Sequence, residues 1–228
     1  MPLDLTGTTI VFDLDGTLVD TAPDLTAAAN HVFGLIGLTP VSPKQLHPFI
    51  SRGSRAMIEE GLRLHGVVKS EDEVTHLHQL FFPYYAENVA TLSRPFDGVP
   101  ALLDKLAGLG ATLAVCTNKF EGLSRSLLGQ LGLDARFVAI AGRDTFEVCK
   151  PDPGHLTQTI AVAGGRADRA VMVGDSEVDM ATALAASVPS IGVTFGYTPV
   201  PIRELRPGAV IEHYREFMPA LEQVLPRG

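Results

Sequence analysis

The sequence has little cysteine and no long uninterrupted hydrophobic run. Its two cysteines, Cys116 and Cys149, are too few for a disulfide framework or a closed four-ligand zinc site. We therefore expect a protein of a reducing compartment, the cytoplasm. Residues 180–202 carry no charged side chain, but three prolines interrupt them, so we expect a helix end, a short strand and a loop there rather than a membrane span.

Basic charge is also scarce. Lysine and arginine number 18 against 26 aspartates and glutamates, which gives a formal net charge of −8. This balance argues against a broad basic face for nucleic acid or an anionic membrane, so we expect neither partner. A small anionic substrate would need a binding site whose local charge is positive although the net charge of the chain is negative. With 228 residues, of which 46% are hydrophobic and 19% charged, the chain can bury a sizeable core without disulfides.

Short apolar, β-branched runs alternate with helical patterns along most of the chain. Strands are predicted over residues 8–12, 112–116, 137–141, 170–173 and 190–193. Helices are predicted over residues 100–109, 123–131, 154–163, 179–186 and 214–225. This alternation is typical of an α/β protein with a parallel sheet covered on both faces, which binds ligands at the carboxyl ends of its strands.

The region after the first predicted strand breaks the alternation and contains only helical periodicity. Ser70 followed by Glu73 predicts a capping box, and Thr21 followed by Asp24 predicts a similar helix start. Two apolar helical faces are predicted, one of Leu25, Ala29, Val32 and Ile36, the other of Val74, Leu77, Phe81 and either Tyr84 or Tyr85. The predicted domains are a core of residues 1–18 and 93–228 and a helical insert of residues 19–92.

Two aspartates follow the first predicted strand directly. Side chains at positions i and i+2 of an extended segment point to the same side, so Asp13 and Asp15 are brought together at the strand end. Two close carboxylates repel each other unless a cation or a useful proton is present. Taken alone, this pair is also typical of an acidic turn before a helix.

Three other predicted strand ends carry groups that complement these acids. Thr117 and Asn118 supply a hydroxyl and an amide after one strand, and Lys150 places a cation before a helix that proline begins. Asp175 and Asp179 follow a further strand. Each residue has an ordinary structural explanation, but the four segments together predict a single site at one edge of the sheet.

In this order, the four segments resemble the signature motifs of the haloacid dehalogenase-like (HAD) superfamily, and the chain resembles its phosphatases over essentially its whole length. The resemblance implies the HAD fold, a Rossmann-like doubly wound parallel sheet with an inserted all-helical cap of type C1. It also implies an Mg²⁺-dependent phosphomonoester hydrolase. Dehalogenases of the superfamily lack an aspartate at the position of Asp15, so phosphoryl chemistry is favoured here.

The resemblance assigns a role to each residue of the site. Asp13 is expected to be the nucleophile that forms an aspartyl-phosphate, and Asp15 the acid that protonates the leaving group and then the base for water. Thr117 and the Asn118 backbone amide are expected to hold phosphoryl oxygens. Lys150 is expected to offset the negative charge around the substrate.

The resemblance also implies a metal site. Mg²⁺ is expected to be held by the carboxylates of Asp13 and Asp175 and by the backbone carbonyl of Asp15, with Asp179 supporting this set. Gly16 is expected to let the chain turn tightly beside the substrate.

The helical insert resembles the cap that covers the active site in this superfamily. Its joint of residues 51–55 offers Arg52 and Arg55 to a carboxylate of the leaving group, and Gly53 allows close backbone approach, although both arginines could simply face solvent. Lys119 and Arg143 are weaker candidates for the same role near the core.

The residues around the motifs, at 20–24, 117–119 and 191–197, are similar to those of bacterial phosphoglycolate phosphatases, so 2-phosphoglycolate is the expected substrate. The joint at 51–55 is more basic than is typical of that family. Alternatives within the superfamily are a sugar-phosphate phosphatase, a β-phosphoglucomutase-like phosphomutase and a pyrophosphatase. A more distant alternative is a non-catalytic binding protein on the same fold.

Overall fold

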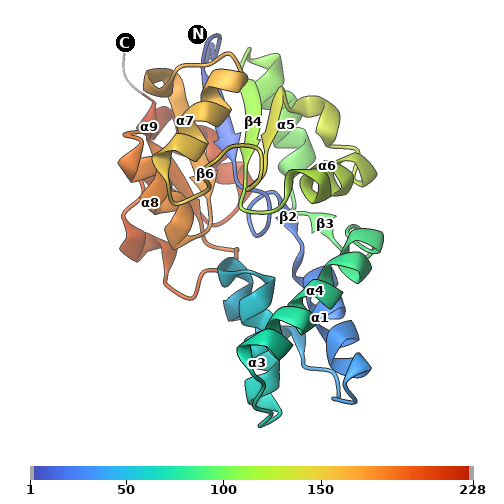
Figure 1. Ribbon diagram of the computed structural model, residues 1–228. Helices are drawn as coiled ribbons and strands as arrows, with labels where there is room; N and C mark the ends of the chain where they lie inside the picture. The colour runs from blue at the N-terminus through green and yellow to red at the C-terminus, as the bar shows by residue number, and fades with distance from the viewer. Residues whose placement is uncertain (1–2, 226–228) are drawn as a thin grey trace. The chain divides into compact units, whose positions relative to one another are not determined.

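The computed structural model describes residues 3–225 of the chain, which forms two compact units (Figure 1). The core unit consists of Met1–Asp20 and Pro95–Gly228, and the helical unit of Thr21–Arg94. Within residues 3–225, no helix combines the length and apolar character that a membrane span requires.

The core unit is built on a six-stranded sheet whose neighbouring strands pair in parallel. Its strands are β1 (Thr9–Phe12), β4 (Thr112–Cys116), β5 (Ala139–Ala141), β6 (Ala170–Gly174), β7 (Ser190–Val193) and β8 (Ala209–Ile211). The spatial order is β5-β4-β1-β6-β7-β8. From β1 the chain builds outward through β4 and β5, then crosses back to β6 beside β1. This is the doubly wound order predicted for the fold, with its switch point between β1 and β6.

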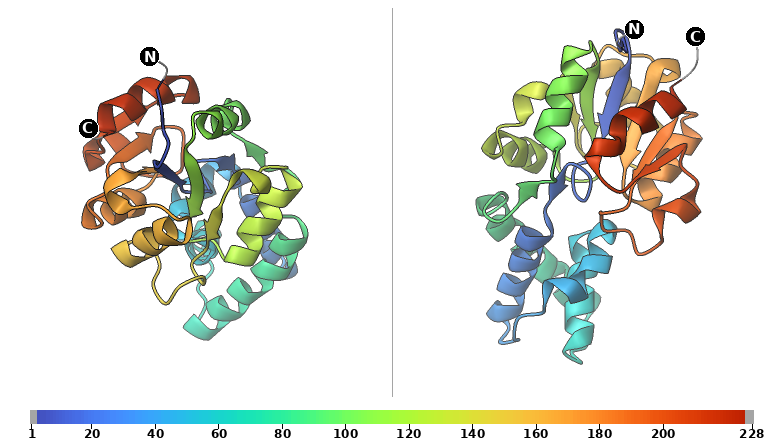
Figure 2. Two further views of the ribbon diagram at one scale, coloured as in Figure 1. Left: turned by 90° about the horizontal axis from the view of Figure 1, so that it is seen from above. Right: turned by 180° about the vertical axis from the view of Figure 1, so that it is seen from behind.

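Helices cover both faces of this sheet (Figure 2). They are α5 (Val99–Gly108), α6 (Glu121–Gln130), α7 (Pro153–Val162), α8 (Glu177–Ala185) and α9 (Phe217–Val224). On one face, Val11 and Met172 of the sheet pack in a buried cluster with Leu156 of α7. On the other, Phe12 stacks on Phe217 of α9 with ring centroids 6.0 Å apart. Neighbouring strand residues point to opposite faces, so both faces of β1 are buried.

The core unit differs from the predicted elements in one strand that is not predicted and in the ends of several others. The pattern does not predict β8, because three residues are too few to show a period. The strand predicted from residue 137 begins at Ala139, since Phe137 donates its N–H to Asp134 in a preceding turn. Two helices, α6 and α8, begin two residues earlier than predicted because each starts with a glutamate, which the apolar pattern leaves out. Helix α8, for example, begins at Glu177 rather than residue 179.

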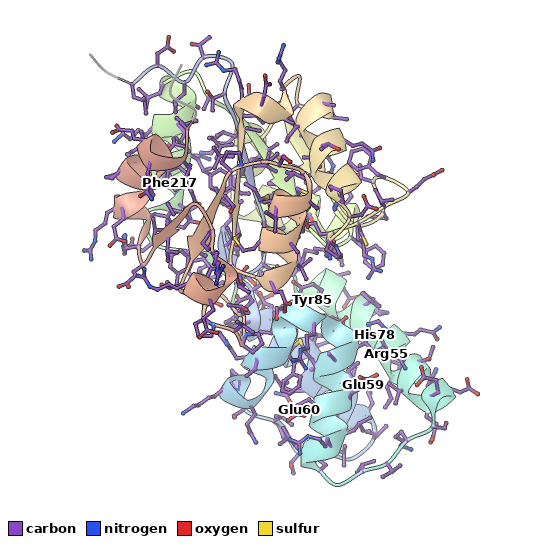
Figure 3. The ribbon with its side chains drawn as sticks, turned by 90° about the vertical axis from the view of Figure 1, so that its left-hand side faces the viewer. Arg55, Glu59, Glu60, His78, Tyr85 and Phe217 are labelled. Atoms are coloured by element: carbon purple, nitrogen blue, oxygen red, sulfur yellow. The ribbon has the colours of Figure 1, made fainter. Side chains whose placement is uncertain are left out.

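The helical unit contains the all-helical structure predicted for the insert. Its elements are α1 (Ala22–Leu35), α2 (Pro43–Leu46), the 3₁₀ helix η1 (His47–Arg52), α3 (Ser54–Leu64) and α4 (Glu71–Glu87). The predicted capping box starts α4, with Ser70 Oγ accepting from Glu73 N at 3.3 Å and Glu73 Oε2 accepting from Ser70 N at 2.9 Å. Of the two candidate tyrosines, Tyr85 is buried and packs on Phe81 (Figure 3).

At the ends of the insert, β2 (Val19–Asp20) and β3 (Arg94–Pro95) pair in a two-stranded sheet. The expectation that the insert contains no strand is therefore wrong at Val19–Asp20. Two residues are too short a segment for a period-2 pattern to identify.

The predicted helix start at Thr21 is correct in position but not in mechanism. Helix α1 begins at Ala22, yet the Thr21 side chain makes no capping hydrogen bond. The buried Asp24 carboxylate instead accepts from Leu92 N at 2.9 Å, from Ser93 N at 2.7 Å and from Ser93 Oγ at 2.6 Å. Asp24 thus ties the first turn of the helical unit to its last residues.

We expect Asp24→Ala to lower the free energy of unfolding by about 3 kcal/mol, because three donors lose a charged acceptor in a buried place. Urea denaturation measures this loss. The control is Asp72→Ala, which removes an exposed acid from the first turn of α4 and should cost under about 1 kcal/mol. Equal losses in the two variants would show that Asp24 does not tie the unit together.

Candidate active site

Three polar side chains follow neighbouring central strands. Asp13 follows β1, Thr117 follows β4 and Asp175 follows β6. Their backbones continue the sheet pattern, since Asp13 N donates to Val173 O at 2.9 Å and Thr117 N to Ala141 O at 3.0 Å. Parallel strands that end together place the next side chains at one edge, which is where a doubly wound sheet binds its ligands.

Asp13, Asp175 and Asp179 form a buried acidic cluster. Each offers a carboxylate oxygen, and these oxygens lie within 4.8 Å of one another. Asp179 reaches the cluster from the first turn of α8, where Ser176 Oγ donates to Asp179 Oδ2 at 2.6 Å. Gly174 leaves room for it, because a Cβ there would lie 2.6 Å from Asp179 Oδ2.

Lys150 is buried against this cluster. Its ammonium lies 2.9 Å from Asp13 Oδ1 and 2.5 Å from Asp179 Oδ1. Two bonds position its backbone: Asn118 Nδ2 donates to Lys150 O at 2.8 Å, and Lys150 N donates to His155 Nδ1 at 3.2 Å. A buried ammonium shared by two carboxylates is held in a narrow range of positions.

The electrostatics of the cluster favour a bound cation. Burial raises the pKa of Asp13 to about 6, and the Asp179 and Asp15 charges add to this rise while Lys150 opposes it. Burial, with Asp179 and Asp13, also raises the pKa of Asp175 well above its usual range. Burial lowers the pKa of Lys150, but the Asp13 and Asp179 carboxylates outweigh it, so the net shift is upward. Three carboxylates with one ammonium leave an excess of buried negative charge.

The oxygen atoms of the cluster fit a metal ion. Asp13 Oδ1 is buried and faces the Lys150 ammonium at 2.9 Å. A set of buried carboxylate oxygens suits a hard divalent cation. Both oxygens of Asp179 already have partners, in Lys150 and Ser176. The cluster could therefore hold a metal ion, with Asp179 the least available of its acids.

The turn after Asp13 is fixed by contacts to Asp175. Gly16 has a φ of +80°, and a Cβ there would lie 2.7 Å from Asp175 Oδ2, so glycine is required on both counts. Thr17 Oγ1 donates to Asp175 Oδ1 at 3.1 Å, and Tyr197 N donates to Asp175 Oδ2 at 2.6 Å. Both oxygens of Asp175 are thus oriented by the surrounding loops.

Asp15 forms an ion pair that the sequence does not predict. Lys119 Nζ lies 3.1 Å from Asp15 Oδ1 and 3.0 Å from Asp15 Oδ2. The lysine side chain is 5% exposed and the aspartate side chain 22% exposed. The two residues are 104 positions apart, so no local pattern identifies the pair.

Thr117 and Asn118 lie where the sequence predicts them, at the end of β4. Thr117 is buried, and its Oγ1 accepts from Lys119 N at 3.3 Å. The Asn118 side chain is bound to the Lys150 carbonyl. Their role toward a phosphoryl group stays a prediction.

Arg55 of the helical unit is engaged within that unit (Figure 3). Its Nε donates to Glu59 at 2.9 Å, its Nη1 to Thr75 at 3.1 Å and its Nη2 to Glu71 at 2.6 Å. All three guanidinium nitrogens therefore have partners on α3 and α4. This arrangement favours a structural role for Arg55 over the substrate-binding role predicted for it.

Arg52 and Gly53 form the joint between η1 and α3. Both are exposed, and the Arg52 guanidinium lies over the ring of Phe49 at 5.8 Å from its centroid. Gly53 has a φ of +93°, which ends η1 and begins α3. Arg52 is thus the more available of the two arginines.

His155 supports the Lys150 loop in its neutral form. It is fully buried, its Nδ1 accepts from Lys150 N, and its Nε2 lies 3.1 Å from the Gly142 carbonyl. Burial lowers its pKa from 6.5 to about 4, and the charge of Lys150 adds to this shift.

We expect this histidine to make the fold acid-sensitive between pH 6.5 and 4. Below pH 6.5 His155 is protonated in the unfolded chain but stays neutral in the folded protein. Its contribution to the free energy of unfolding is therefore fully present above pH 6.5 and is lost as the pH falls toward 4. At pH 5 the loss is about 2 kcal/mol relative to pH 7.5. Urea denaturation of the wild type and His155→Gln at both pH values isolates this contribution. If both proteins lose the same stability, His155 is not its source.

Comparisons with known proteins identify the family. A family model described as haloacid dehalogenase-like hydrolase matches residues 10–193. A Mesorhizobium japonicum protein named phosphoglycolate phosphatase is 48% identical over 208 residues, which is 90% of this chain and 90% of that protein. One from Agrobacterium fabrum with the same name is 45% identical and covers 96% of this chain and 94% of its own.

Solved structures agree on the fold. The crystal structure of a Haemophilus somnus protein, described as a predicted phosphoglycolate phosphatase, superposes with a TM-score of 0.85 at 27% identity. The match covers 94% of this chain and 97% of that one. The strand-end acids, the doubly wound sheet and these matches lead to one conclusion. The chain belongs to the haloacid dehalogenase-like hydrolases.

Proposed function

We propose that this protein is an Mg²⁺-dependent phosphomonoester hydrolase. Its substrate is a small phosphorylated metabolite, and we propose 2-phosphoglycolate as the preferred one. The observation that carries the proposal is a buried set of charges: Asp13 and Asp175 follow the central strands β1 and β6, and Lys150 and Asp179 pack against them. The choice of 2-phosphoglycolate rests on the names of the relatives that are 48% and 45% identical. The cysteine content and a metabolite substrate support a cytoplasmic location.

In the first step, an Asp13 carboxylate oxygen attacks phosphorus in line. A bond forms between this oxygen and phosphorus while the bond from phosphorus to the ester oxygen breaks. Asp15 gives its proton to the departing alkoxide. In the second step, Asp15 takes a proton from water, whose oxygen attacks the same phosphorus and releases phosphate and the free Asp13 carboxylate.

The other residues hold the charges of this reaction in place. Lys150, fixed between Asp13 and Asp179, offsets charge at the phosphoryl group, and Thr117 with the Asn118 amide would bind its oxygens. The carboxylates of Asp13 and Asp175 and the carbonyl of Asp15 would hold Mg²⁺, which supplies charge neutralisation for the phosphate.

The contacts in the structure support some of the assigned metal and substrate ligands more strongly than others. Because both oxygens of Asp179 have partners, we assign it the positioning of Lys150 rather than a direct metal bond. Arg52 and Gly53 stay candidates for binding the leaving group. Arg55 is a weaker one, since its guanidinium is bound within the helical unit.

A substrate panel tests the proposal. Phosphate release from 2-phosphoglycolate, glucose 6-phosphate and pyrophosphate is compared as kcat/KM with Mg²⁺ present and after chelation by EDTA. We expect 2-phosphoglycolate to give the highest value and EDTA to stop all release. A higher value for another substrate would overturn the narrower assignment. Release of no phosphate from any ester, p-nitrophenyl phosphate included, would favour a binding protein. Isomerisation of glucose 1-phosphate with little phosphate release would favour a phosphomutase.

A further inference from the structure

We propose that Lys119 determines specificity by binding a carboxylate on the leaving group of the substrate. Its ammonium is paired with Asp15. When an ester that carries a carboxylate beside its ester oxygen binds, Lys119 is shared between Asp15 and that carboxylate. This inference rests on the proposed function and adds that the core unit recognises the carboxylate of the substrate.

The position of Lys119 follows from its backbone. Its carbonyl accepts from Arg143 N at 3.0 Å, and its N–H donates to Thr117 Oγ1 at 3.3 Å. Gly142 permits this close approach, because a Cβ there would lie 2.6 Å from the Lys119 carbonyl oxygen. The loop after β4 is therefore held on both sides, and the nearly buried side chain is directed to Asp15.

The proposed chemistry places the leaving group beside Lys119. Asp15 must lie within hydrogen-bond reach of the ester oxygen to protonate it. In a glycolyl ester, only two covalent bonds separate this oxygen from the carboxylate carbon. An ammonium paired with both oxygens of Asp15 is thus next to the place that the substrate carboxylate occupies. Since an ammonium has three donors, it can donate to an oxygen of Asp15 and to the substrate carboxylate at the same time.

The charges of the core make such a cation necessary. A substrate carboxylate near Asp13, Asp15 and Asp175 would be repelled unless a positive group met it. Lys150 lies between Asp13 and Asp179, where it serves the phosphoryl end. Lys119 is placed at the other end, beside the residue that protonates the leaving group. The two lysines therefore divide the recognition of the substrate's two anionic groups.

The test compares 2-phosphoglycolate with ethyl phosphate, which lacks the carboxylate. If Lys119 acts only by positioning Asp15, its loss slows both esters equally. The ratio of kcat/KM for 2-phosphoglycolate to kcat/KM for ethyl phosphate therefore isolates carboxylate binding. We expect Lys119→Met to lower this ratio at least tenfold and to weaken inhibition by the product glycolate. Lys119→Arg keeps the cation and should restore part of the ratio. Lys105→Met, the same change at an exposed lysine of α5, is the control and should leave the ratio unchanged.

The outcomes separate this inference from the function on which it rests. If the wild type prefers 2-phosphoglycolate and Lys119→Met keeps that preference, the role of Lys119 is overturned and the proposed function stands. If the wild type hydrolyses p-nitrophenyl phosphate but shows no preference for the carboxylate, the substrate and the role of Lys119 both fall. If no ester is hydrolysed, the proposed function itself fails. Circular dichroism checks the fold, and Lys119→Gln replaces Lys119→Met if that variant does not fold.

Discussion

Asp13→Asn is expected to abolish phosphate release, lowering kcat by at least about 10⁴-fold, because an amide cannot serve as the nucleophile. The fold should be retained, since asparagine has nearly the same shape. The change also removes a buried charge whose pKa is raised by burial and by Asp179 and Asp15, so we expect an unfolding temperature no lower than that of the wild type.

Phosphate release and thermal unfolding of the same preparation measure both effects. Asp97→Asn is the matched control, because it makes the same change at an aspartate on the surface of the core unit, whose side chain is 91% exposed. It should retain full activity. An Asp13→Asn protein that is folded and still turns over would remove Asp13 from the role of nucleophile.

Asp15→Asn is expected to divide the reaction into a fast and a slow step. Loss of an acid and base typically costs 10²- to 10⁴-fold, so turnover of 2-phosphoglycolate should fall by about 10³-fold. With p-nitrophenyl phosphate, whose leaving group needs no proton, the first step should survive while attack by water is slowed. We expect a burst of about one p-nitrophenol per active site, followed by slow release.

Rapid-mixing absorbance measurements detect this burst. Asp20→Asn is a useful comparison because Asp20 lies on the same segment and accepts from Tyr197 OH at 2.7 Å, outside the acidic cluster. It should show steady turnover without a new burst. Equal slowing of both esters by Asp15→Asn, with no burst, would contradict the acid and base role of Asp15.

The sheet and the acids at its strand ends could be predicted because both leave a local pattern. Buried parallel strands are continuous apolar runs, and each of the central ones is followed directly by a polar residue, as in Asp13, Thr117 and Asp175. Once the runs are assigned to one parallel sheet, geometry brings their ends together. The structure bears out this fold, and it places the three acids of the cluster within reach of one metal ion.

Contacts between distant segments could not be predicted in the same way. The pair of Lys119 and Asp15 joins two loops, and nothing near either residue indicates the other. Asp24 fits a helix-capping pattern, but its carboxylate is used by Leu92 and Ser93 at the far end of the insert. The contacts of Arg55 could not be predicted either: the basic joint indicates a binding site, and its guanidinium donates to Glu59 and Glu71 within the helical unit, so its role toward a substrate stays a prediction.

The central claim is that phosphate passes through a covalent bond to Asp13. The most direct test quenches the enzyme in acid during turnover of 2-phosphoglycolate with Mg²⁺ and locates the phosphoryl group by peptide mass spectrometry. With p-nitrophenyl phosphate as the substrate, the Asp15→Asn variant, in which only the second step is slowed, should accumulate the most label. We predict the phosphoryl group on Asp13 and its absence from Asp13→Asn. Label on another residue, or rapid phosphate release by Asp13→Asn without label, would contradict the account.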